Sequence, residues 1–279
     1  MTLSNKNTHQ FAIFYAICSV FSYSWYQYYN LTFSSLSPVY FTNRLDLTLN
    51  IVLMSNLQHI LISNKWLRIL FDILFLIFPV FLMYCFIKTN KFQKTLAIIT
   101  SIFCTVYSLM FSAMSFISIE VFLAWMLIPL IFFSKNIKSF YYFMHSLRIL
   151  FIIFFFSGSL WKVFSNAIFN TEQMSSILLF QHANYLASEG STIYKGVLFF
   201  LIKHSTISLI FYLAAFFAEF IFIIGLFTKK FDKGLIFIFC LFLFFDYAIM
   251  GINYTSWLPF MGCFYFSNLT YSKLKNEDS

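Results

Sequence analysis

The run Phe140–Phe164, FYYFMHSLRILFIIFFFSGSLWKVF, is the most informative part of this sequence for its fold class. It is longer than the roughly 20 mainly apolar residues that a helix needs to cross a bilayer. Only Arg148 and Lys162 in it carry a permanent charge. The run therefore predicts a membrane-spanning α-helix whose two cations need an explanation.

Similar apolar runs lie on both sides of this one. They predict seven further spans, near residues 10–29, 66–87, 95–115, 117–134, 205–228, 232–251 and 254–270. Hydrophobic residues make up 61% of the 279 positions and charged residues 10%, whereas a soluble domain carries roughly a quarter charged residues. Gly and Pro are too sparse to mark a linker, so we expect an all-α, polytopic membrane protein with a single transmembrane domain over 1–279 and about eight helices.

Basic residues lie between the predicted spans in an alternating pattern. They follow every second span, as Lys88, Lys91 and Lys94, then Lys135 and Lys138, then Lys229, Lys230 and Lys233, then Lys273 and Lys275. By the positive-inside rule both termini are cytoplasmic, in a cell membrane that we take to be a bacterial inner membrane. The basic residues of these loops then account for the net charge of +8. We therefore expect the lipid bilayer, and no nucleic acid, as a partner.

Two long connections fall on the outer side in this topology, near residues 30–65 and 165–204. The second contains TEQMSSILLF at 171–180. Both connections are apolar enough to lie on the membrane or to fold back over the helices. The five Cys residues are scattered in apolar runs without metal-ligand spacing, so we expect neither a disulfide framework nor a metal site.

Ionisable residues inside membrane helices are costly and indicate functional sites. This chain has six candidates: Asp72, Glu120, Arg148, Lys162, Glu219 and Asp246. Arg148 and Lys162 are about 21 Å apart on one helix face. In the predicted topology Glu219 and Arg148 lie at the same depth in the membrane. This placement predicts an ion pair between them that joins two helices.

In the predicted topology, Lys162 lies at about the same depth in the membrane as three carboxylates, those of Asp72, Glu120 and Asp246. Together they would line a polar cavity open to the outer side, with Lys162 as a catalytic base and the acids as further catalytic candidates. Burial disfavours the charged form of a lysine, and a nearby carboxylate favours it. The alternative is that Lys162 only extends to the membrane interface. The small residues Ser157-Gly158-Ser159 predict a close helix contact before it.

The second half of the chain resembles the HTTM family, the horizontally transferred transmembrane proteins related to vitamin K-dependent gamma-carboxylase. The resemblance rests on Leu147-Arg148-Ile149, Ser157-Gly158-Ser159-Leu160-Trp161-Lys162, Ala214-Ala215-Phe216-Phe217-Ala218-Glu219 and Phe245-Asp246-Tyr247-Ala248-Ile249-Met250-Gly251-Ile252. It is strongest over residues 140–266. In the family a short membrane-hugging helix follows the lysine, and residues 171–187 resemble it.

The resemblance implies that Lys162 matches the carboxylase lysine that deprotonates vitamin K hydroquinone, so a quinone is the cofactor it suggests. Two departures argue against quinone-driven carboxylation. Ser118-Ile119-Glu120 stands where the carboxylase has an Asn-His pair, and the lumenal domain that grips its substrate is absent. Small bacterial relatives include the membrane component that matures a secreted sporulation-delaying toxin. Our leading interpretation is that the chain is an enzyme, or an enzyme subunit, that modifies a secreted peptide. We expect a small accessory protein as a further partner.

Two other classes of function stay open at this point. The chain could be a non-catalytic accessory or immunity protein that binds a secreted peptide. It could also be related to the DoxX-type redox membrane proteins, although eight spans and no cysteine pair argue against that.

Overall fold

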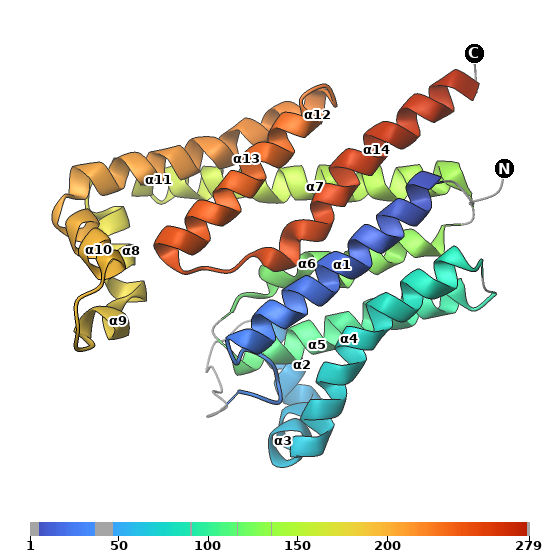
Figure 1. Ribbon diagram of the computed structural model, residues 1–279, viewed down its shortest axis with the longest axis horizontal. Helices are drawn as coiled ribbons and strands as arrows, with labels where there is room; N and C mark the ends of the chain where they lie inside the picture. The colour runs from blue at the N-terminus through green and yellow to red at the C-terminus, as the bar shows by residue number, and fades with distance from the viewer. Residues whose placement is uncertain (1–5, 37–46, 90, 116, 135, 278–279) are drawn as a thin grey trace. The chain divides into compact units, whose positions relative to one another are not determined.

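The computed structural model describes residues 6–36, 47–89, 91–115, 117–134 and 136–277 (Figure 1). The chain is 84% helical, and no strand occurs in these ranges. The all-α prediction is therefore confirmed. Lys135 and part of the predicted 30–65 connection lie outside the described residues.

The chain folds as two compact units, and the boundary between them lies inside one long helix. The first unit contains residues up to Leu147 and from Thr255 onward, and the second contains Arg148–Tyr254. The helix in question is α7, Ile137–Phe164. The single transmembrane domain over 1–279 stays a prediction.

The first unit is built from helices near both ends of the chain. They are α1 Lys6–Tyr28, α2 Leu47–Ser55, α3 Leu57–Ser63, α4 Lys65–Ile87, α5 Gln93–Met114, α6 Leu123–Leu127 and α14 Leu258–Glu277. Short 3₁₀ turns, Ile119–Phe122 and Ile128–Phe133, flank α6. Aromatic rings fill the core: Phe11 of α1 lies 5.8 Å from Phe132 and 5.7 Å from Phe266 of α14. Aromatic ring contacts of this kind stabilise a core beyond the area that they bury.

The second unit contains the rest of α7 and the helices that follow it. They are α8 Gln173–Gln181, α9 Ala183–Ala187, α10 Ile193–Lys203, α11 Ser205–Phe220, α12 Ile224–Phe227 and α13 Asp232–Phe245. A single π-helical turn, Asp246–Met250, continues α13. Phe151 and Phe155 of α7 pack against Phe222 and Phe239 with centroids 4.6–6.1 Å apart. Buried aromatic rings thus hold α7 to the helices that follow it in this unit.

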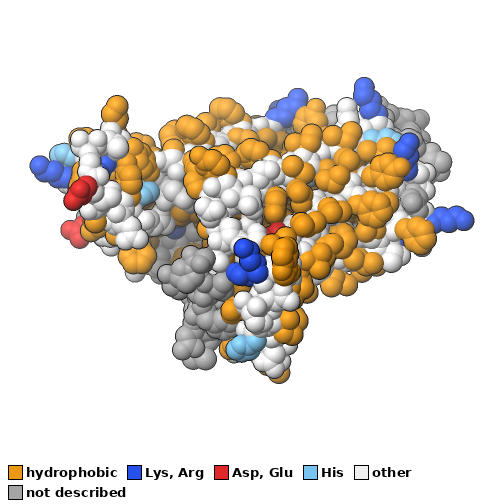
Figure 2. Space-filling model, turned by 60° about the horizontal axis from the view of Figure 1, so that its bottom comes forward, with side chains coloured by type: hydrophobic (Ala, Val, Ile, Leu, Met, Phe, Trp, Pro, Cys, Tyr) orange, Lys and Arg blue, Asp and Glu red, His pale blue; other side chains and the backbone are white. Residues whose placement is uncertain are grey.

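Among the described residues, five helices are long and apolar enough to cross a membrane: Lys65–Ile87, Gln93–Met114, Ile137–Phe164, Ser205–Phe227 and Asp232–Met250. They correspond to the predicted second, third, fifth, sixth and seventh spans. The face in Figure 2 is covered largely by hydrophobic side chains, with few charged ones. A surface of this kind suits hydrocarbon rather than water, so the prediction of a membrane protein is supported.

The other three predicted spans also form helical structure, but of different kinds. Residues 119–133 form short helical pieces, too short for a span of their own. The helices α1 and α14 are long enough, but they are not among the five that are also apolar enough. The count of eight spans and the location of the termini remain predictions.

Candidate functional site

Lys162 and Glu219 form a buried ion pair between α7 and α11. Lys162 Nζ donates to Oε1 and to Oε2 of Glu219, at 2.5 Å in each case. The exposed fractions of the two side chains are only 18% and 8%. The two charges therefore neutralise each other in a place with little water, where their attraction is strong and their desolvation costly.

Two neighbouring residues shape this ion pair. Gly158 lies one turn before Lys162 on the same face of α7. A Cβ at Gly158 would lie 3.1 Å from Oε2 of Glu219, so the missing side chain leaves the space that the carboxylate occupies. The close helix contact predicted at this glycine is confirmed. The ring of Tyr212 on α11 lies 5.7 Å from Lys162 Nζ, in range for a cation–π attraction.

Arg148 forms a second buried ion pair, and its partner is Asp232. Arg148 Nε donates to Oδ2 of Asp232 at 2.9 Å, and Nη2 donates to Oδ1 at 2.5 Å. The same Nη2 donates to the backbone oxygens of Gly225 at 2.8 Å and Thr228 at 3.2 Å. Both side chains are 1% exposed. Arg148 thus fastens α7 to the end of α12 and the start of α13.

The predicted ion pair between Arg148 and Glu219 is corrected by these contacts, because each residue has another partner. The reason is the direction of helical side chains, which tilt toward the N-terminus of their own helix. α7 and α11 run antiparallel, since Arg148 meets Thr228 and Lys162 meets Glu219. Arg148 and Glu219 therefore point away from each other, and Glu219 points toward Lys162. Asp232 was missed, although its place at the start of a predicted span was a usable signal.

Asp246 lies at the point where α13 changes into a π-helical turn. Such turns are rare and frequent at functional sites. Its carboxylate interacts electrostatically with both Lys162 and Glu219, and it accepts no hydrogen bond from the part of the chain that the structure describes. The predicted grouping of Lys162 with Asp246 stays a prediction, to which this electrostatic interaction adds Glu219 as a third member.

His182, at the end of α8, fastens the π-helical turn. Its Nε2 lies 2.9 Å from the backbone oxygen of Ile249. The turn ends at Gly251, which has a φ of 68° and faces the His182 ring. The position of Asp246 therefore depends on a contact from a short helix that sequence reasoning treated as a membrane-surface segment.

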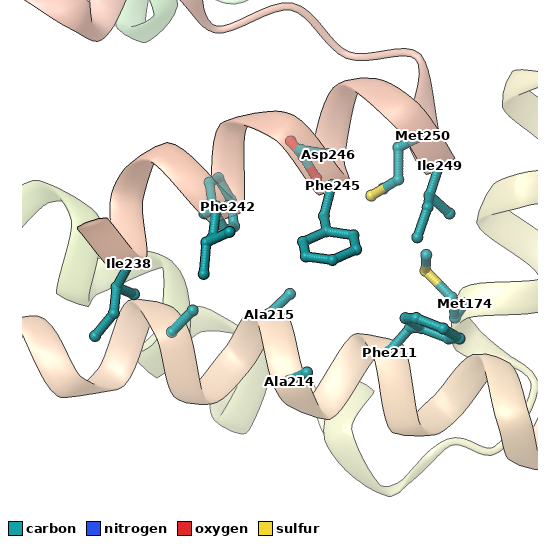
Figure 3. A pocket seen from close by; sticks show the side chains of 12 residues that line it. Met174, Phe211, Ala214, Ala215, Ile238, Phe242, Phe245, Asp246, Ile249 and Met250 are labelled. Atoms are coloured by element: carbon teal, nitrogen blue, oxygen red, sulfur yellow. The ribbon is translucent and has the colours of Figure 1, made fainter. Parts of the chain in front are cut away.

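A pocket of about 290 Å³ opens between α11 and α13 beside Asp246 (Figure 3). Phe211, Ala214, Ala215 and Ala218 line it from α11, while Phe242 of α13 and Asp246 of the π-helical turn line the other side. Asp246 is the single charged side chain among its lining residues. The outward polar cavity that the sequence suggested is therefore mostly apolar here.

Asp72, the first acid predicted to face Lys162, is engaged within the first unit. It is 2% exposed and accepts hydrogen bonds from the backbone N–H groups of Phe33 and Ser34, at 3.2 and 2.7 Å. It also accepts one from the hydroxyl of Tyr107 at 2.8 Å. These three donors assign Asp72 to holding the chain after α1 against α4 and α5.

Glu120, the second predicted acid, is also in the first unit. Its side chain is exposed, and its backbone oxygen accepts a hydrogen bond from the Trp257 indole at 3.0 Å. A ring that joins Asp72 and Glu120 to Lys162 would involve both units, so it stays a prediction.

Comparison of the chain with protein-family models, with curated proteins and with solved structures finds no match. The site must therefore be interpreted from its own geometry. Among the described residues there is no group of three or more His, Cys, Asp or Glu side chains that could hold a metal ion. What the second unit offers chemically is a paired base and acid, a further carboxylate and an apolar pocket.

Proposed function

We propose that this chain is an HTTM-like, multi-pass membrane enzyme or enzyme subunit that modifies a secreted peptide, with Lys162 as its base. The observation that carries the proposal is the buried pair of Lys162 and Glu219 beside Asp246. An amine and a carboxyl group that share a proton in an apolar place are suited to acid–base chemistry. The resemblance over residues 140–266 supports the same role for Lys162.

The ion pair suggests how Lys162 becomes a base. An N–H bond of the ammonium breaks and an O–H bond forms on Glu219, which leaves a neutral amine and a neutral carboxylic acid. Low-dielectric surroundings favour such a neutral pair over two charges. The amine then removes a proton from the substrate, and Glu219 holds the other proton until it is returned.

The proposed setting is a bacterial inner membrane with eight spans and both termini in the cytoplasm. The five apolar helices and the alternating lysines support this topology. Lys162 then lies toward the outer surface, where a secreted peptide and a small accessory protein can reach it. Quinone chemistry gains little support from the pocket, because quinone carbonyls need hydrogen-bond donors and its one charged side chain, Asp246, is an acceptor when ionised.

A second candidate is a non-catalytic accessory or immunity protein that binds a secreted peptide. The observation that favours it is that Lys162 and Glu219 satisfy each other's hydrogen bonds. A pair that only joins α7 to α11 would have the same geometry.

Mass spectrometry of a secreted peptide encoded beside the gene separates the two candidates. Cells with the wild-type chain, with Lys162→Ala and with Lys203→Ala are compared at matched expression. Lys203 is an exposed lysine at the end of α10 and serves as the control. We expect modified peptide from wild type and Lys203→Ala and only precursor from Lys162→Ala. The same product from all three would refute the catalytic role.

A further inference from the structure

The pocket between α11 and α13 has the form of a groove for one apolar chain. Its lining extends along α13 and the π-helical turn from Ile238 to Met250, a length of roughly 18 Å at the helical rise. Its volume of about 290 Å³ lies at the small end of the range for ligand pockets. Three alanines and Phe211 line it from α11, and the alanines leave space between the larger side chains of the lining (Figure 3).

The surroundings of this groove limit what can fill it. Both helices that form it belong to segments apolar enough to cross a membrane. Neighbouring side chains such as Phe217 and Phe237 are 61% and 64% exposed. In a bilayer these side chains contact hydrocarbon, so the molecules that reach the groove are amphiphiles with apolar chains.

The charges at the groove indicate which head group such a molecule would carry. When all three groups are ionised, Lys162 contributes one positive charge and Glu219 and Asp246 one negative charge each, which leaves a net charge of −1. Glu219 is paired with Lys162 at 2.5 Å, while the side-chain carboxylate of Asp246 accepts no hydrogen bond from the described residues. An unbalanced charge in an apolar place is costly, and one positive charge would balance it.

We propose that this groove binds a single-chain amphiphile with a positively charged amino head, with its chain along Ala214, Ala215 and Ala218 and its amine at Asp246. This inference goes beyond the proposed function. It needs no catalysis by Lys162, and its test measures binding alone. Peptide modification and amine binding can therefore fail separately.

The test uses photoreactive probes on the full chain in nonionic detergent. Three diazirine probes share one alkyl chain and differ in the head, which is a primary amine, an alcohol or a carboxylate. We expect the amine to label peptides of α11 and α13 at least about tenfold more than the carboxylate, because like charges repel at Asp246. Unlabelled alkylamine should compete, and the fatty acid of the same length should not.

Three variants locate the binding site. Ala215→Phe fills the groove, whereas Ile210→Phe adds the same ring to an exposed position of α11 outside it. We expect Ala215→Phe to reduce amine labelling to about a tenth and Ile210→Phe to leave it unchanged. Asp246→Asn removes the charge at similar shape, so amine and alcohol probes should then label equally.

Several results would overturn the proposal. Equal labelling of wild type by amine and carboxylate would do so, as would labels spread over the exposed faces of the spans. An unchanged amine preference in Asp246→Asn would refute the role of its charge. If Ala215→Phe does not fold by gel filtration, competition on wild type still decides: displacement by the fatty acid as strong as by the alkylamine contradicts the proposal.

Discussion

Arg148 is the charged side chain whose removal should destabilise the second unit most. It is the partner of buried Asp232 and a donor to two backbone oxygens near the end of α12. Arg148→Ala leaves the carboxylate without a counter-charge, which costs about 3–5 kcal/mol of unfolding free energy. Unfolding by detergent titration in mixed micelles measures this loss.

A double variant separates the missing arginine from the stranded acid. In Arg148→Leu/Asp232→Leu no unpaired charge remains, so we expect more than half of the lost stability to return. A double variant as unstable as Arg148→Leu alone would show that the backbone contacts of Arg148 matter more than the ion pair.

Lys229, between two spans, gives a pH-dependent prediction. Burial lowers the pKa of its amine from 10.5 to about 8, with the positive charge of Arg148 adding to the shift and Asp232 opposing it. Labelling of Lys229 with an amine-directed reagent should therefore have its midpoint near pH 8 in the folded chain. In the unfolded chain the midpoint should move up to about pH 10.5.

The sign for stability follows from the same shift. Between pH 8 and 10.5 the unfolded chain binds more protons at Lys229 than the folded chain does. The contribution of this group to stability therefore rises with pH in that window and is constant below it. A labelling midpoint that is the same in folded and unfolded protein would contradict the burial of this amine.

At the scale of elements, the π-helical turn depends on Gly251. Its φ of 68° is left-handed, and a Cβ there would lie 3.3 Å from Cε1 of His182. Gly251→Ala should cost about 1–2 kcal/mol and should loosen residues 246–252, which hydrogen exchange measures. Gly234→Ala in α13 is the control, since it has open space and helical backbone, and it should be neutral or stabilising.

Helices with strong apolar runs could be predicted from the sequence, and the polar contacts between them only in part. The five long apolar helices among the described residues follow from hydropathy along the chain, and depth along the chain predicts that Lys162 and Asp246 lie near each other. Depth in the membrane does not give the direction in which a side chain points. It therefore predicts an ion pair of Arg148 with Glu219, although the tilt of helical side chains favours Asp232 as the partner. The pairing of Lys162 with Glu219 follows from the same tilt.

The pocket and the π-helical turn could not be predicted for a different reason. The turn depends on His182, which is 64 positions before Asp246 in the chain and contacts a backbone oxygen. No periodicity in the sequence reports such a contact. The role of Asp72 was also hidden, because two of its three partners are backbone N–H groups just after α1.

At the scale of the whole molecule, the predicted topology can be tested with reporter fusions. A reporter active only in the cytoplasm should be active after Ser279 and inactive when inserted at Gly190, in the connection at 165–204. The lysines that follow alternate spans are the reason for this orientation. An active reporter at Gly190 would place Lys162 on the cytoplasmic side and remove its access to a secreted peptide.

The most direct test of the central claim, that Lys162 acts as a base, is the peptide product made by Lys162→Arg. Arginine keeps the positive charge and can pair with Glu219, but it does not release its proton under working conditions. The account predicts a folded chain with unfolding free energy within about 1 kcal/mol of wild type and with only unmodified precursor. Wild-type amounts of modified peptide from Lys162→Arg would contradict it and leave the ion pair a purely structural role.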